Sequence, residues 1–79
     1  MMNVKVKVYD DVKYNPESKK VSEVEYSNIQ SIEVKVIEDG DLYRYGFNDY
    51  DEYKEYCFLT FADGEVSTFR NSHVDIFRI

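Results

Sequence analysis

The sequence has few of the residues that reinforce a small domain or carry out catalysis. Cys57 is the only cysteine, so an internal disulfide cannot form, and Cys57 with the single His73 is too few for an ordinary zinc site. A lone cysteine is typical of a reducing compartment. A chain of 79 residues buries only about 60–65% of its unfolded surface. Oligomerisation is the remaining way to reinforce such a domain, so the sequence also points to a homo-oligomer.

A long apolar segment is also missing. The longest uncharged and strongly apolar run is 56–62, far shorter than the roughly 20 residues of a membrane-spanning helix. Near the N-terminus, lysine alternates with valine over residues 4–8, where a signal peptide would have an unbroken apolar run. These features predict a cytoplasmic protein without a membrane partner.

Strand patterns dominate the rest of the sequence. Apolar residues alternate with polar ones, or form short β-branched and aromatic runs, between turn-forming residues. The segments with such patterns are 4–8, 21–26, 32–36, 42–47, 56–62, 66–70 and 74–79. Asn48 is placed to cap a short helical turn near residues 48–55. The sequence predicts an all-β fold of six or seven short strands, arranged as a small antiparallel β-barrel or a two-layer meander.

The clearest turn signal is Asp63-Gly64, a pair that favours a type I′ hairpin. A two-residue turn there pairs Phe61 with Val66 and Phe58 with Phe69. The residues predicted to be buried in the core are Ile32, Val34, Phe58, Phe61, Phe69 and Phe77.

The last third of the chain resembles the end of SH3-like barrels. Its predicted hairpin at Asp63-Gly64, corner at residues 71–73 and final strand at residues 74–79 follow one another in the order seen in those folds. The resemblance concerns topology alone and implies no functional residues.

Residues 21–34 and 66–79 show a weak similarity at a constant offset of 45 positions. Val21-Ser22 matches Val66-Ser67, Ser27 matches Ser72, and the apolar spacing is shared. Such self-similarity indicates a repeated unit. It predicts one domain, residues 1–79, in which both segments form strand, polar corner and strand, with each corner serine bonded to its local backbone.

Acidic charge is concentrated in residues 38–55, here called the acidic segment. The net charge of the chain is −6, and this segment has seven acids and two bases, a net charge of −5. Residues 1–37 have six acids and six bases and are neutral overall. Because ionised carboxylates are buried only when paired, most acids of the segment must face water together.

Metal binding and catalysis fit the acidic segment poorly. Residues 39–41 begin like a calcium loop, but Tyr43 takes the third ligand position and Arg44 takes the place of the required glycine. The sequence shows no nucleophile with an adjacent base and no glycine-rich phosphate loop. Cys57 is predicted to be a buried core thiol, and His73 a turn residue. We therefore expect no metal, no cofactor, no catalytic residues and no enzymatic activity.

Binding of a protein partner is the interpretation that the acidic segment favours. Tyrosine offers rigid contact area, and clustered carboxylates attract basic surfaces. In size, charge and tyrosine content the chain is similar to small acidic β proteins with which phages block nucleic-acid-binding enzymes. We therefore predict an inhibitor or nucleic-acid mimic with a basic, nucleic-acid-binding protein as partner. The predicted surface comprises Glu38, Asp39, Asp41, Tyr43, Tyr45, Asp49, Tyr50, Asp51, Glu52, Tyr53 and Glu55.

Two alternatives stay open, and direct nucleic-acid binding is disfavoured. The protein could be a structural or oligomer-building domain whose acidic segment only keeps it in solution, or a binder of a small ligand at its tyrosines. The chain has ten lysines and arginines against sixteen acids, whereas nucleic-acid affinity comes mainly from basic side chains on phosphates.

Overall fold

A computed structural model describes residues 1–48 and 52–79 of the protein. Its elements are β1 (Met2–Tyr9), β2 (Lys20–Val36), the 3₁₀ turn η1 (Leu42–Tyr45), β3 (Glu55–Phe61), β4 (Val66–Arg70), the 3₁₀ turn η2 (Asn71–His73) and β5 (Val74–Arg78). The five strands form an antiparallel sheet in the order β4-β3-β2-β1-β5. The prediction of an all-β fold is confirmed for the described residues. Among these residues, no helix has the length and apolar character needed to cross a membrane.

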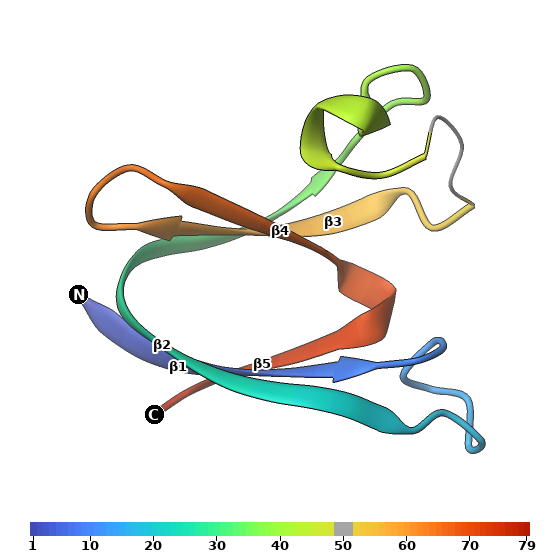
Figure 1. Cartoon of the computed structure of the whole chain (residues 1–79), viewed down its shortest axis with the longest axis horizontal. Coiled ribbons are helices and arrows are strands. Elements are labelled where there is room, and N and C mark those ends of the chain that lie inside the picture. The colour runs from blue at the N-terminus through green and yellow to red at the C-terminus, as the bar shows by residue number, and fades with distance from the viewer. Residues whose placement is uncertain (49–51) are drawn as a thin grey trace.

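The long strand β2 joins the two layers of the curved sheet (Figure 1). Its N-terminal half pairs with β1, from Tyr9↔Lys20 to Met2↔Ile29, and its C-terminal half pairs with β3. The strand turns at Asn28, whose φ of 59° lies in the left-handed region that asparagine tolerates. A shift of register between Ile29 and Ser31 adds to the bend, as bulges do.

The predicted number of strands, six or seven, was too high, since the described residues form five strands. The predicted strands 21–26 and 32–36 belong to the single strand β2, because the polar corner between them is only a bend. The predicted strand 42–47 contains η1 instead.

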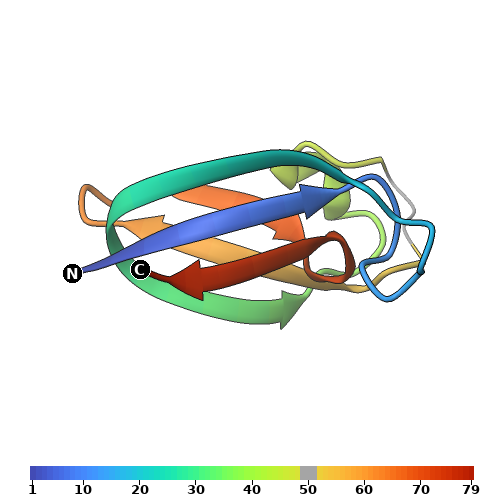
Figure 2. The ribbon, with the colours of Figure 1, turned by 90° about the horizontal axis from the view of Figure 1, so that it is seen from below.

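The end of the chain follows the predicted order of hairpin, 3₁₀ corner and final strand. β3 and β4 form the hairpin, η2 turns the chain, and β5 pairs with β1 from Val8↔Val74 to Val4↔Arg78. Figure 2 shows β1 between β2 and β5 in the layer that these three strands form. β4 and β5 are the two ends of the sheet order, and no ladder among the described residues joins them into a closed barrel.

The predicted register of the β3–β4 hairpin was wrong by one residue. Thr60 faces Val66 and Cys57 faces Phe69, whereas Phe58 faces Thr68. Gly64 N donates to Phe61 O at 2.9 Å and Phe61 N donates to Glu65 O at 2.8 Å, so the loop has three residues. Among the described residues other than glycine only Asn28 has a positive φ, which excludes a type I′ turn at Asp63. Gly64, with φ of 92°, takes the left-handed position of a three-residue loop.

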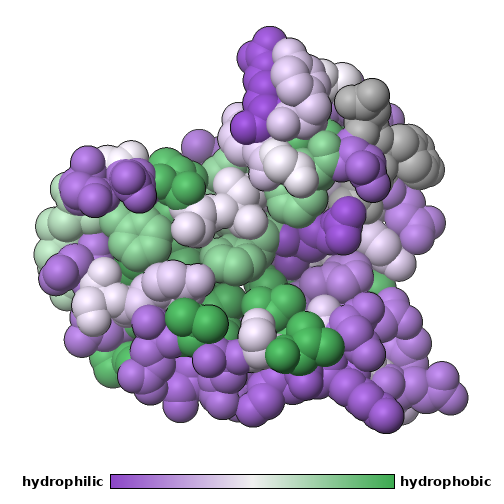
Figure 3. Space-filling model, viewed as in Figure 1, coloured by the Kyte–Doolittle hydropathy of each residue, from purple (hydrophilic) through white to green (hydrophobic). Residues whose placement is uncertain are grey.

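Two clusters of buried side chains form the core, one on each face of β3. The first lies between the two layers and consists of Val4, Val6, Ile29, Leu59 and Val74. The second lies on the outer face and consists of Ile37, Leu42, Tyr56 and Phe58. On the face seen in Figure 3, hydrophobic side chains gather in a band between the layers and hydrophilic side chains surround them.

Only part of the predicted core is buried. Phe58 is buried, and Ile32, Phe61 and Phe69 are partly buried against the first cluster. Val34 is 54% exposed and Phe77 is 46% exposed, so both predictions were wrong. Val34 lies in the half of β2 that, within residues 1–48 and 52–79, has a partner strand on one side only. Phe77 lies on the outer face opposite Lys5, with the Lys7 ammonium 5.2 Å from its ring centroid.

The two segments of the predicted repeat differ in secondary structure. Residues 21–34 lie within β2, whereas residues 66–79 divide into β4, η2 and β5. The Ser72 hydroxyl lies 2.7 Å from Nδ1 of His73, so it contacts a side chain where a backbone contact was predicted. Both segments have a strand on either side of a corner, but the corner is a bend within β2 at Asn28 in the first segment and the 3₁₀ turn η2 in the second.

Candidate protein-binding surface

The first part of the acidic segment covers the outer face of β3. We call residues 37–48 the η1 segment. It leaves the end of β2 where Ile37 N donates to Lys54 O at 3.2 Å, and it lies outside the two layers of strands (Figure 1). Asp41 N donates to Glu38 O at 3.1 Å, which closes a tight turn before η1.

The end of η1 is a Schellman motif, and it explains why this part of the chain is not a strand. Gly46 has a φ of 86° and its N–H donates to Tyr43 O, while Phe47 N donates to Leu42 O at 3.1 Å. Glycine accepts this left-handed conformation without strain, and the motif usually includes an apolar contact across it. Here Leu42 belongs to the second cluster, and the partly buried Phe47 packs against that cluster.

Aromatic contacts hold the η1 segment on the sheet. Leu42 is 1% exposed and packs with Tyr56 and Phe58 of β3. The Phe47 ring lies 4.8 Å from the Tyr56 ring, and the Tyr45 ring meets the Phe58 ring edge-on at 5.4 Å between centroids. The segment is therefore fixed from its buried side, and its other side chains face outward.

The exposed side of the η1 segment combines carboxylates with tyrosines. Glu38, Asp39 and Asp41 are exposed, and Tyr43 and Tyr45 are 61% and 44% exposed. This arrangement agrees with the expectation that acids and tyrosine rings of the segment share the surface.

Basic side chains neutralise part of this surface. Lys54 Nζ lies 2.8 Å from Asp39 Oδ1, and Arg44 Nε lies 3.7 Å from Asp41 Oδ1. The hydrogen bond from Arg44 to the Tyr43 hydroxyl, together with the charge of Asp41, raises the pKa of Arg44. Within the described residues Glu38 has no ion-pair partner. The net charge of −5 already counts these two bases, and their ion pairs place them beside Asp41 and Asp39.

The other predicted surface residues divide into two groups. Asp49, Tyr50 and Asp51 lie outside the described residues, so three of the eight residues of the predicted helical turn at 48–55 do too. No helix is present at residues 52–54, and Glu55 begins β3. Glu52 is exposed, whereas Tyr53 and Glu55 face a separate cleft.

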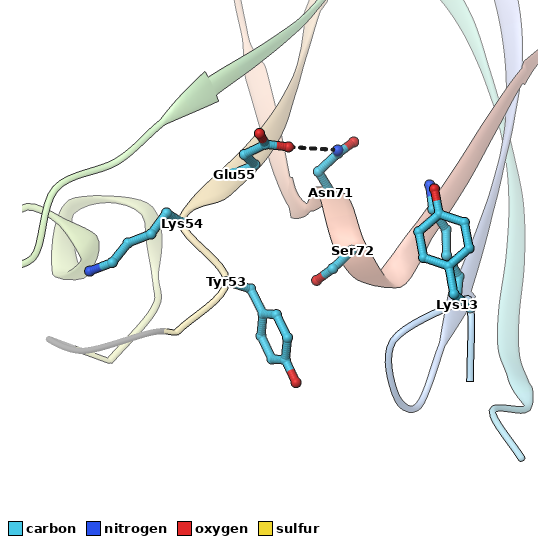
Figure 4. A pocket seen from close by; sticks show the side chains of 7 residues that line it. Lys13, Tyr53, Lys54, Glu55, Asn71 and Ser72 are labelled. Carbon is cyan, nitrogen blue, oxygen red and sulfur yellow. Dashed lines mark hydrogen bonds between the residues drawn. The ribbon is translucent and has the colours of Figure 1, made fainter.

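That cleft has a volume of about 300 Å³ and lies between the β1–β2 loop, the start of β3 and η2. Its lining comprises Lys13, Tyr14, Tyr53, Lys54, Glu55, Asn71 and Ser72. Figure 4 shows the Tyr53 ring pointing toward the cleft and the Lys54 side chain pointing away, toward η1. The sequence did not indicate that a cleft would include Lys13, Tyr14, Asn71 or Ser72. The first two of these residues lie far from the last two in the chain, and they come together only in the folded protein.

Polar groups around the cleft bond to one another. Lys13 N donates to Ser72 O at 2.9 Å, and Lys13 Nζ donates to Val74 O at 2.9 Å and lies 3.4 Å from Asp75. Asn71 Nδ2 donates to Glu55 at 3.4 Å. The Tyr53 ring meets the His73 ring edge-on at 5.1 Å. These contacts hold the β1–β2 loop against η2, so they give the polar residues of the cleft a structural role.

Side chains that bind metals are not clustered in the part of the chain that the structure describes. Among the described residues, no group of three or more histidine, cysteine, aspartate or glutamate side chains could bind a metal ion. Ser72 and His73 are in contact, but no carboxylate is in contact with the His73 ring among the interactions of the described residues. The arrangement therefore lacks the third group that orients the base in a catalytic triad.

Cys57 is 2% exposed, in agreement with the prediction of a buried thiol. Burial raises the pKa of the Cys57 thiol, and the charge of Lys13 partly offsets this effect. A raised pKa favours the neutral thiol in the fold. Burial of the neutral Cys57 thiol therefore contributes fully to the stability of the fold at pH values below the thiol pKa of the unfolded chain. This contribution is lost as the pH rises through the higher thiol pKa of the folded protein.

We expect the native Cys57 thiol to react with Ellman's reagent at least about 100-fold more slowly than the unfolded chain, because reaction requires local opening. The measurement is the absorbance of the released thiolate with and without denaturant. Equal rates in both conditions would contradict the placement of Cys57 in the interior.

No known family model matches this chain, and comparisons with curated proteins and with solved structures found no significant similarity.

Proposed function

We propose that this protein is a non-enzymatic interaction module that binds a basic partner through the exposed side of the η1 segment. The observation that supports this most is the combination of Glu38, Asp41, Tyr43 and Tyr45, all exposed, on a segment anchored through buried Leu42. A segment already held in one conformation loses less entropy on binding than a free loop.

The chemistry of these side chains suits a basic protein surface. Tyrosine is enriched in interfaces because it offers a large, rigid area with a hydroxyl at its tip. Exposed carboxylates accelerate the encounter with a positively charged partner and orient it. The partner we propose is a nucleic-acid-binding protein, whose groove carries the basic charge that normally meets phosphates.

The more specific form of the proposal is an inhibitor of the kind that phages use against bacterial enzymes, acting in the cytoplasm as a nucleic-acid mimic. It is supported by the small size of the chain, its net charge of −6 and its eight tyrosines. A mimic competes with nucleic acid for the same groove, and this competition distinguishes it from other acidic binding proteins.

Neutralising three acids of the acidic segment should weaken this binding. The variant is Glu38→Gln, Asp41→Asn and Glu52→Gln, three exposed positions. The control is Glu17→Gln, Glu25→Gln and Glu65→Gln, which are also exposed and change the net charge equally. Both immobilised variants and the parent are compared for capture of proteins from the heparin-retained fraction of a bacterial lysate. We expect the first variant to lose most of the capture, and the control to retain it.

Salt and nucleic acid provide the specific readouts. Captured protein should be released as salt rises, because the Debye length falls from about 10 Å at 0.1 M to about 3 Å at 1 M. A duplex DNA or RNA oligonucleotide should displace it if the protein is a mimic. Equal loss of capture in both triple variants would show that only the net charge matters. Capture that resists the oligonucleotide would contradict mimicry while leaving protein binding intact.

A further inference from the structure

Among the described residues, no strand pairs with one edge of the C-terminal half of β2. Residues after Ile29 pair with β3 only, whereas the ladder with β1 covers the N-terminal half. Within the described residues, the second edge of this half therefore has no ladder. Unpaired backbone groups of such an edge are ready to pair with another strand.

The side chains along this edge are apolar on one face of the strand and charged on the other. Val34 is 54% exposed and Val36 is 58% exposed, and both lie on the same face as partly buried Ile32. Glu33 and Lys35 point to the opposite face, where they form an ion pair of 2.9 Å. Exposed valines on an open edge leave apolar surface in water, which a second strand would cover.

We propose that a second copy of this chain pairs with the edge, antiparallel, about a two-fold axis at Val34. In this register Val34 faces Val34 of the second copy, and Ile32 faces its Val36. Glu33 faces Lys35 of the second copy, and the symmetry repeats this contact. Opposite charges in facing positions stabilise a strand pair, and like charges destabilise it. The two copies would then share one sheet, in the order β4-β3-β2-β2-β3-β4, through an isologous contact.

Other edges of the sheet are not complementary to themselves in this way. In the N-terminal half of β2, pairing about Val24 would place Glu23 against Glu25 of the second copy. Pairing of β4 about Thr68, or of β5 about Ile76, would bring no opposite charges into facing positions. The charge pattern therefore selects the C-terminal half of β2. This inference does not depend on the proposed function of the η1 segment.

Charge reversal tests the register directly. Glu33→Lys would place lysine against lysine at both contacts, and Lys35→Glu would place glutamate against glutamate. We expect each variant alone to be monomeric, whereas an equimolar mixture should form a heterodimer, because all facing charges are then opposite. The parent should approach twice the chain mass of 9.4 kDa as concentration rises, measured by light scattering after size exclusion. Glu17→Lys and Lys19→Glu, at exposed positions outside this edge, are controls with the same charge changes, and they should dimerise like the parent.

A disulfide at the symmetry axis gives a second, independent measurement. In a Cys57→Ala background, Val34→Cys should form an intermolecular disulfide on mild oxidation. The background is needed because Cys57 faces Val34 within one chain. Val36→Cys should not cross-link, since its equivalents would be about 14 Å apart along the strands. Circular dichroism of each variant verifies that it is folded.

Three results would overturn the proposal. The first is a parent chain that stays monomeric up to about 1 mM, a concentration at which even a weak dimer is populated. The second is a Glu33→Lys variant that dimerises like the parent, or a mixture that stays monomeric. The third is cross-linking of Val36→Cys as readily as of Val34→Cys, which would show association in another register.

Discussion

Replacing Leu59 with alanine is expected to lower the free energy of unfolding by about 2–5 kcal/mol, the usual cost of truncating a leucine in a packed core. Leu59 is fully buried in the middle of β3, between Ile32 of β2 and Ser67 of β4. Its side chain packs between the layers against the first cluster, where no neighbour can move to fill the cavity without disturbing both layers. A domain of this size has a total stability of only about 4–12 kcal/mol. The variant should therefore be near the limit of folding.

The matched control is Val34→Ala on the neighbouring strand. Val34 shares the inner face with Leu59, but it is 54% exposed at the open edge, so the change should stay within about 0.5 kcal/mol. Both variants are measured by urea denaturation followed by circular dichroism, at a concentration low enough to keep the chain monomeric. If Val34→Ala proved as damaging as Leu59→Ala, the edge of β2 would be covered in the folded monomer.

This pair of residues shows what periodicity can and cannot predict. Alternation correctly indicates that Val34 lies on the inner face of a strand. It does not indicate whether that strand has one neighbour or two, and this decides how deeply the side chain is buried. Leu59 lies between two neighbours in the sheet, yet it has no stronger local signal than Val34.

The error in the predicted register of β3 and β4 affected more residues than the error in the exposure of Val34. The Asp63-Gly64 pair correctly predicted a hairpin, but the loop has three residues and the expected one had two. A shift of one residue exchanges the two faces of a strand relative to its partner. Phe58 was therefore expected against Phe69, whereas it faces Thr68 and packs outward against the η1 segment.

The η1 segment carried a local signal that alternation obscured. Tyr43, Tyr45 and Phe47 alternate like a strand, but the pattern of Leu42 followed by Gly46-Phe47 fits the end of a helical turn. The partners of Leu42 on β3 could not be predicted, since they come together only through the pairing of strands. The same holds for the cleft, whose residues near Lys13 and Ser72 lie far apart in the sequence.

Replacing Leu42 with alanine should detach the η1 segment without unfolding the rest of the domain. Leu42 is 1% exposed and joins η1 to Tyr56 and Phe58, so we expect a loss of about 2–5 kcal/mol in the stability of this segment. Hydrogen exchange separates this local effect from global unfolding. The amides of Gly46 and Phe47, which bond within the turn, should exchange faster, while amides of β1 and β3 should keep their protection.

The same variant tests whether binding needs a fixed surface, because it leaves the net charge unchanged. If the proposed partner recognises carboxylates and tyrosines in one arrangement, Leu42→Ala should weaken its capture even though every acid is present. Leu42→Met is the control, since it keeps the volume of the side chain and should cost less than about 1.5 kcal/mol. Loss of amide protection at Gly46 and Phe47 together with unchanged capture would show that the acids act as a diffuse charge. In that case the packing of η1 on β3 would serve stability alone, and the position of Tyr43 and Tyr45 would have no part in recognition.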